Sequence, residues 1–504
     1  FDATQIEIRV GGNSEAYTID RVALGISLRS LFFGDPIVSD LTIDGMVIDL
    51  ADSGWNTSTT ENREFEILEG ITVPQIEQLA LRNILIKSSN GTALLLEDWD
   101  IKEIQAGNRM SLDGTGQLAA RDYRINGNVG SFADLAKQVR PYPLNIELQH
   151  QDFNISLEGS ILRPLRAGNS RLTFEAGAPD ISAALAAQGI ETPPLGELTA
   201  KGELTGSLEK PSLDELSIVL SKGKTLSFKA SGSIANLRAM ENDVIQFSGN
   251  TNDPELLTWM LPDNLSGTEQ WQIQGRLITS KTGLRLEDLD AVGIDPHGLT
   301  LKLNGSGMLE NFTAQQPFSS LDLVATLTSG NTAAARSLLV EALPEMGPVQ
   351  GTMRITAAPQ EKVAFEDIDV VVGLGQETTL KATGRIARLP LEEDIPITGV
   401  DLQLELSAVS SSRLAELFDI ELPVIEPVQI KGHFIGSKFK SSIEEISLQV
   451  GKAQKLALKA TGAIQFDDLS KDEYIKDTNL KIGFSAPTTD LLAKFIGQKL
   501  PELG

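Results

Sequence analysis

The residue types that usually carry catalysis or bind metals are scarce in this chain and are not grouped. The three histidines, His150, His297 and His433, are far apart in the sequence and lack the spacing of a metal site. The lack of cysteine excludes disulfides, thiolate metal sites and cysteine nucleophiles. The tripeptide Gly-Lys-Thr at 223–225 resembles the end of a phosphate-binding loop, but Ile218 occupies the position that requires the first glycine. We therefore expect a β-turn at 223–225, and no cofactor, metal site or enzymatic activity.

The charge balance limits the partners that the surface can bind. Among 504 residues, 69 Asp and Glu against 43 Lys and Arg give a formal net charge of −26. Such a surface repels polyphosphate, so we expect no nucleic-acid partner. It also disfavours broad adhesion to anionic headgroups, so any lipid contact should be with buried acyl chains. No apolar run approaches the roughly 20 residues that span a bilayer, so we expect any membrane anchor to lie outside this chain.

Alternation of apolar and polar residues predicts β-strands over most of the chain. In 455–466, Leu456, Leu458 and Ile464 alternate with Lys455, Lys459 and Gln465, and 402–408 and 480–486 follow the same pattern. Because successive side chains of a strand point to opposite faces, this pattern predicts a sheet with one apolar face and one solvated face.

The chain also repeats itself. Four segments of the chain end in similar strands, which are Leu226–Ile234, Leu301–Leu309, Leu380–Ile386 and Leu458–Ile464. Their glycines, Gly232, Gly307, Gly384 and Gly462, are 75, 77 and 78 residues apart. Each of these strands follows a strand with acidic residues near its start, at 213–220, 286–291, 365–372 and 443–450. A period of this length indicates a repeat array.

One short amphipathic helix is predicted in each unit. The candidates are Asp253–Leu261, Asn331–Leu343, Ser410–Phe418 and Thr489–Leu500, with weaker ones at Asp180–Ala187 and Ser131–Val139. Each begins with a residue whose side-chain oxygen can cap free amide groups. A unit of about 75–80 residues thus comprises four or five antiparallel strands and one helix. We expect less regular units at 1–170, repeats at 171–243, 244–320, 321–400 and 401–479, and the start of a further repeat at 480–504.

One short helix for four or five strands is too little to cover a flat apolar face. A sheet that curls lengthwise would line a trough with that face, and the helices would cap part of the opening. A β-sandwich array would produce the same alternation, and periodicity does not separate the two.

The order of these landmarks resembles that of the AsmA-like family of the bacterial envelope. The resemblance rests on the order of alternating strand, capped helix followed by proline, glycine-marked strand, acidic-start strand and final LKATG-type strand. It extends to Leu28–Gly34 (LRSLFFG), Ile37–Leu50 (IVSDLTIDGMVIDL) and Asp52–Asn56 (DSGWN), and it covers essentially the whole chain. It implies a mostly β, elongated repeating β-groove, a curled antiparallel sheet with one short helix per repeat.

The resemblance also implies a function and a place. We expect a periplasmic, bridge-like lipid transport protein of a Gram-negative envelope, anchored to the inner membrane by a segment outside this chain. Its partners would be phospholipid acyl chains and envelope or outer-membrane proteins. Assembly of outer-membrane proteins and a purely structural role as a β-solenoid or adhesin stalk remain alternatives.

The alternation marks the side chains that would line such a groove. The expected lining residues are Leu216, Ile218, Leu226, Phe228, Leu301, Leu303, Ile368, Val370, Leu380, Ile386, Leu402, Leu404, Ile446, Leu448, Leu456, Leu458, Ile464, Ile482 and Phe484.

Overall fold

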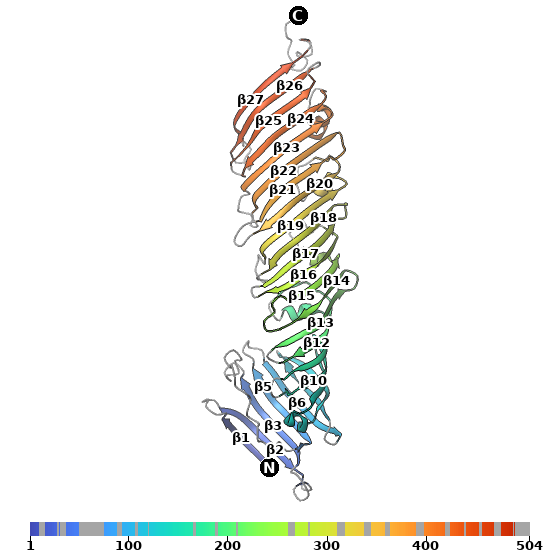
Figure 1. The fold of residues 1–504 in the computed structure, drawn as a ribbon, viewed down its shortest axis with the longest axis vertical. Helices are drawn as coiled ribbons and strands as arrows, with labels where there is room; N and C mark the ends of the chain where they lie inside the picture. Colours follow the sequence, from blue (N-terminus) through green and yellow to red (C-terminus); the bar gives the residue numbers. More distant parts are fainter. Residues whose placement is uncertain are drawn as a thin grey trace. The chain divides into compact units, whose positions relative to one another are not determined.

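The part of the chain that the structure describes folds mostly into β-strands. A computed structural model describes residues 1–9, 16–27, 30, 37–49, 75–87, 93–105, 109–118, 120–164, 168–186, 190–207, 210–260, 268–280, 283–309, 318–336, 344–357, 363–389, 398–418, 424–437, 440–452, 456–467, 475–486 and 488. Strands make up 72% and helices 8% of these described residues, and the sheet is open and curled (Figure 1). The predicted fold class, a curled sheet with few helices, is therefore confirmed.

The chain divides into two compact units, Phe1–Ile245 and Gln246–Gly504. The strands of the first unit are β1 (Asp2–Arg9), β2 (Ala16–Ile26), β3 (Ile37–Asp49), β4 (Gln75–Ile76), β5 (Gln78–Lys87), β6 (Ala93–Gln105), β7 (Arg109–Leu118), β8 (Arg121–Gly130), β9 (Pro141–His150), β10 (Asn154–Leu162), β11 (Ser170–Ala178), β12 (Glu197–Gly206), β13 (Pro211–Lys222) and β14 (Leu226–Ile234). Its helices are α2 (Phe132–Lys137) and α3 (Ile181–Ala186), and β15 (Val244–Thr251) crosses the boundary between the units.

Most neighbouring strands of the first unit are consecutive in sequence and antiparallel. This holds for β1 to β3 and again for β5 to β14. The exception is β3, which pairs in parallel with the short β4 and with β5, so that Ile43 lies opposite Leu81 and Met46 opposite Ile84. The first unit is therefore less regular than a simple meander.

The second unit is a continuous antiparallel meander, and Figure 1 shows its strands stacked in chain order. Its strands after β15 are β16 (Gln270–Ser280), β17 (Gly283–Ile294), β18 (Thr300–Leu309), β19 (Phe318–Ser329), β20 (Val349–Ala357), β21 (Val363–Val372), β22 (Thr378–Leu389), β23 (Thr398–Ala408), β24 (Val428–Gly436), β25 (Ser441–Gly451), β26 (Ala457–Phe466) and β27 (Ile475–Ser485). Its helices are α4 (Pro254–Met260), α6 (Thr332–Ala335) and α7 (Ser411–Phe418).

The order of elements repeats along the chain. A strand, a short helix and three further strands recur from β11, β15, β19 and β23, with α3, α4, α6 and α7 in the helix position. Helix α2 follows β8 in the same way, but only β9 and β10 separate it from β11. The predicted helices are therefore confirmed at these five positions, whereas Thr489–Leu500 and the Asp52–Asn56 turn lie outside the described residues.

The strands with acidic starts each contain a β-bulge. In β13, β17, β21 and β25 an acidic residue at the bulge has a left-handed φ of 50–53°. These residues are Glu215, Asp288, Asp367 and Glu445. A bulge strengthens the local twist of a strand, so one bulge in each repeat bends the sheet at the same position.

The glycine of the following strand lies directly opposite the bulge. The first residue after each bulge pairs with it, as Leu216–Gly232, Leu289–Gly305, Ile368–Gly384 and Ile446–Gly462. The equivalent position in the second repeat is therefore Gly305, and the sequence-based choice of Gly307 is wrong by two residues. The error arose because both are glycines in one strand and only the register distinguishes them.

Candidate functional site

The second unit has one apolar face, which the register defines strand by strand. Leu402 lies opposite Phe434, Phe434 opposite Ile443, and Ile443 opposite Ile464. From β23 to β26, the described residues on this face include no Asp, Glu, Lys, Arg or His. A face without charge can be covered only by apolar groups, whether from the protein or from a ligand.

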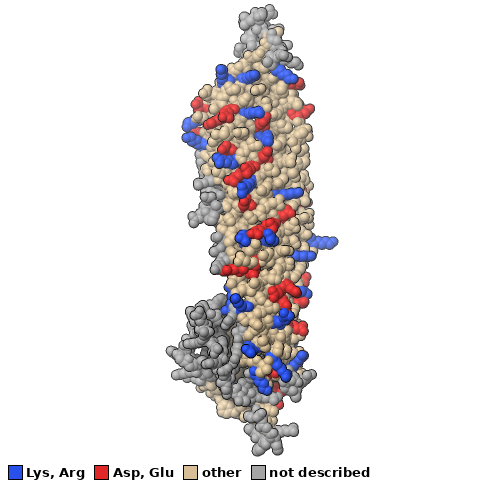
Figure 2. All heavy atoms as spheres, in the orientation of Figure 1, with Lys and Arg blue, Asp and Glu red and all other residues tan. Residues whose placement is uncertain are grey.

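The opposite face carries the charges of the strands, and many of them are paired across strands. Arg354 Nη2 lies 2.7 Å from Asp322 Oδ2, and Lys431 Nζ lies 3.0 Å from Glu405 Oε1. The hydrogen bond from Arg354 lowers the pKa of Asp322 below its usual value. Figure 2 shows basic and acidic side chains interleaved on the visible surface of the strands. Alternation thus separates a solvated face from an apolar one, as the sequence predicts.

Helices cover one part of the apolar face, next to the strand ends that they connect. Leu414 of α7 is buried with Ala408, Val428 and Val450, which lie at the ends of β23, β24 and β25. We call this part the covered half. In α6, the equivalent helix of the preceding repeat, Ala334 and Ala335 are buried with other strand-end residues, namely Leu327, Val349 and Val372.

The rest of the apolar face lies toward the other strand ends, on the bulge side. It is formed by Ile386, Leu402, Phe434, Ile443 and Ile464, which we call the open half. These side chains are half-buried, as are Leu406, Ile430 and Leu448 at the margin of the core beside α7, whereas the strand residues at the centre of that core are 3–9% exposed. The open half is thus an apolar surface that still reaches solvent.

The sequence-predicted lining residues all lie on the apolar faces, but in different surroundings. Ile368, Val370 and Leu380 belong to the core beside α6, and Leu448, Leu456 and Leu458 pack into the core beside α7. Ile386, Leu402 and Ile464 lie in the open half. Ile482 and Phe484 of β27 are 56% and 47% exposed. The register places the remaining predicted residues on these faces as well, namely Leu216, Ile218, Leu226, Phe228, Leu301, Leu303, Leu404 and Ile446.

Two members of the open half, Phe434 and Ile443, were not predicted from the sequence. Both lie next to irregularities, since β24 and β25 shift register between Lys431 and His433. The extra residue of this bulge lies in β25 and interrupts the alternation there after Ile443, whereas Val428, Ile430, Gly432 and Phe434 alternate without a break in β24. The order of helix and strand is the signal that could have found them, because it fixes which strand end the helix covers. Lys455, one of the polar residues in the alternation predicted for 455–466, lies outside the described residues.

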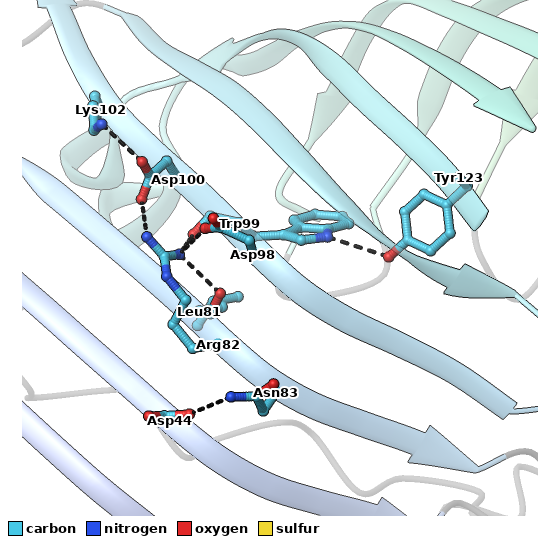
Figure 3. A network of polar contacts seen from close by, with 9 residues as sticks. All are labelled: Asp44, Leu81, Arg82, Asn83, Asp98, Trp99, Asp100, Lys102 and Tyr123. Carbon is cyan, nitrogen blue, oxygen red and sulfur yellow. Dashed lines mark hydrogen bonds and ion pairs between the residues drawn. The ribbon is translucent and has the colours of Figure 1, made fainter.

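The first unit has an apolar face of its own with a polar network on the other side (Figure 3). Arg82 binds Asp98 and Asp100 at 2.8 Å each, and it donates to the carbonyl oxygen of Trp99 at 2.7 Å. On the apolar side, Trp99 Nε1 donates to the hydroxyl of Tyr123 at 3.2 Å. The polar atoms of this aromatic pair are therefore satisfied, and the rings can remain within an apolar cluster.

Glycines on the apolar faces make room for aromatic rings. A Cβ atom added at Gly114 would lie 2.7 Å from the ring of Trp99, and one at Gly202 would lie 2.8 Å from the ring of Phe174. At Gly275 the same atom would lie 2.9 Å from Phe247. At these three positions glycine leaves room for a ring of the preceding strand, whereas the repeat glycines Gly232, Gly384 and Gly462 face a backbone carbonyl oxygen.

The described residues contain no group of three or more His, Cys, Asp or Glu side chains placed to hold a metal ion. His433 hydrogen-bonds to Asp401 at 2.7 Å, and residues 223–225 form the turn between β13 and β14, as predicted. A cavity of about 400 Å³ lies at the ends of β9 to β12, next to Leu162 and Arg171. No helix within the described ranges has the length and apolar character that crossing a membrane requires.

Comparison with known proteins gives no match to a protein-family model, a curated protein or a solved structure.

Proposed function

We propose that this chain is a lipid conduit whose apolar face shelters phospholipid acyl chains. The observation that carries the proposal is the open half, an apolar strip in successive strands that is only half-buried and whose face has no charged residue among those described from β23 to β26. Exposed apolar strips of this kind mark binding surfaces, because water solvates them poorly. Acyl chains are the ligand that suits a surface with no charged group.

The sequence resemblance to the AsmA-like family supports the cellular setting of this proposal. On that basis the protein acts in the periplasm, is anchored to the inner membrane, and passes phospholipid toward the outer membrane. It works without a cofactor and is not an enzyme.

Binding on the open half depends on area and has little chemical specificity. Burial of apolar surface contributes about 25 cal/mol per Å², or roughly 0.8 kcal/mol per methylene group. Because the strip offers the lipid no charged partner, neighbouring positions along the strands bind with similar affinity. A ligand held in this way can move from one repeat to the next without breaking a strong polar contact.

A matched pair of charge substitutions tests the proposal. Ile464 lies in the open half, and Gln465, the next residue of β26, is exposed on the polar face. Ile464→Asp puts a carboxylate where acyl chains bind and should strongly reduce the phospholipid that is extracted from detergent-free protein and quantified by mass spectrometry. Gln465→Asp should retain the wild-type amount.

Circular dichroism and thermal melting must first show that both variants are folded. Equal lipid content in the two folded variants would contradict the proposal. Wild-type protein that carries no phospholipid and takes up none when it is offered would favour the structural stalk. Crosslinking to unfolded barrel proteins in place of lipid would favour the assembly factor.

A further inference from the structure

A hydroxyl group at the start of three helices makes the same bridge to the segment that leads into the next strand. In each case the side-chain oxygen accepts a hydrogen bond from a backbone amide 13 or 14 residues further on. The three bridges are Ser182–Leu195 at 2.8 Å, Thr332–Met346 at 3.1 Å and Ser411–Ile425 at 2.8 Å. We call each bridge a latch. Its recurrence in three repeats shows that the position belongs to the repeated design of the fold.

Further hydrogen bonds reinforce each latch. The hydroxyl of Thr332 donates to the carbonyl oxygen of Gly347 at 3.0 Å, and the hydroxyl of Ser182 donates to that of Pro193 at 2.9 Å. At the third latch, the amide of Ser411 donates to the carbonyl oxygen of Ile425 at 2.9 Å. Thr332 is 0% exposed and Ser411 is 5% exposed, so water cannot readily replace these partners.

In the last two latches, the residue whose amide donates the hydrogen bond is buried in the core beside the helix. Met346 is buried with Ala334 and Val349, and Ile425 is buried with Leu414 and Val428. The latch therefore connects the start of the helix to the segment that packs under it. Apolar contacts have no preferred direction and would allow the helix to shift, whereas a hydrogen bond requires one geometry and fixes the helix in one position.

We infer that Thr332 and Ser411 are positioning residues of the proposed groove, whose latches hold α6 and α7 on the apolar face and so set where the open half begins. The latch itself follows from the hydrogen bonds, and only its effect on lipid rests on the proposed function. Loss of the hydroxyl leaves a buried amide without an acceptor, which weakens the closed position of the helix. The helix then uncovers apolar surface beneath it.

Thr332→Val removes the hydroxyl with little change of shape, and Thr332→Ser keeps it. We expect hydrogen exchange at the Met346 amide to rise roughly fivefold or more in Thr332→Val and to stay near the wild-type rate in Thr332→Ser. Fluorescence of a bound apolar dye should rise in the first variant alone. Ser411→Ala and Ser411→Thr form the same pair for the Ile425 amide.

Two results would overturn the inference. One is a wild-type exchange rate at Met346 in Thr332→Val. The other is a rise in exchange spread equally over β20, β21 and β22, which would show a general loss of stability and no positioning role.

Phospholipid uptake separates this inference from the proposed function. Thr332→Val should take up more fluorescent phospholipid than wild type, because more apolar surface is open. If exchange at the Met346 amide and dye fluorescence both rise in Thr332→Val while neither this variant nor wild type binds phospholipid, the latch is supported and the proposed function is contradicted. If wild type binds phospholipid while the Met346 amide is unaffected by the substitution, the function stands and the latch fails.

Discussion

At the scale of single residues, the recurring positions are those where the backbone leaves ordinary strand geometry. The bulge residues Glu215, Asp288, Asp367 and Glu445 take left-handed conformations that acidic side chains tolerate better than β-branched ones. The facing glycines have no room for a side chain, since a Cβ atom at Gly384 would lie 2.0 Å from the carbonyl oxygen of Asp401. These positions define the repeat more sharply than any apolar residue does.

Gly462 provides a test of this requirement. A Cβ atom there would lie 1.9 Å from the carbonyl oxygen of Asn479, and its φ is 151°. Gly462→Ala should lower the free energy of unfolding by about 1–3 kcal/mol, because the backbone must shift to remove the clash. In Gly483→Ala the new Cβ meets nothing within 4 Å, so the change should stay within about 0.5 kcal/mol. Chemical denaturation measures both, and equal losses would contradict the role assigned to Gly462.

At the scale of elements, the short helix α6 depends on side chains that bind its free amides. Glu345 accepts hydrogen bonds from the amides of Thr332 and Ala333 at the start of α6, at 3.0 and 2.8 Å, and from that of Gly347 at 3.0 Å. Partial burial raises the pKa of Glu345, but these amides and the nearby Arg336 more than offset that effect and lower it overall.

A lowered pKa makes the contribution of Glu345 to stability depend on pH. The contribution is fully present above the unfolded-state pKa of about 4.3 and is lost as the pH falls through the lower folded-state value. Glu345→Gln removes the charge, so it should reduce the free energy of unfolding at pH 7 by roughly 0.5–1 kcal/mol. Denaturation of wild type and variant at several pH values should show this difference shrinking below about pH 4. A difference that does not vary with pH would show that the charge is irrelevant.

Much of this fold could be predicted from the sequence, because alternation and period are local signals. The strands, the five described helices and the side of each strand that is apolar follow from them. The parallel pair of β3 and β5 could not be predicted, because it joins segments separated by a long connection. The division of the apolar face was also missed. Leu458 and Ile464 alternate identically in the sequence, yet only Leu458 packs into the core beside α7.

At the scale of the whole molecule, charge and apolar surface are kept apart. On the solvated face of the described strands, basic and acidic groups pair across strands. Ion pairs at such exposed positions are worth about 0–1 kcal/mol each, so they contribute less to stability than the apolar face does. The apolar face must therefore be covered, by the protein's own helices in one half and, in our proposal, by lipid in the other.

Site-specific photocrosslinking tests this central claim most directly. A photoreactive phenylalanine analogue at Phe434 would lie in the open half, one at Ile435 would lie on the polar face, and one at Leu414 would lie on α7, within the buried core of the covered half. Detergent-free protein is irradiated after purification, and adducts are identified by mass spectrometry. We expect a phospholipid adduct at position 434 and essentially none at 435 or 414. Equal labelling at 434 and 435, or no lipid adduct at 434 in folded protein, would contradict the account.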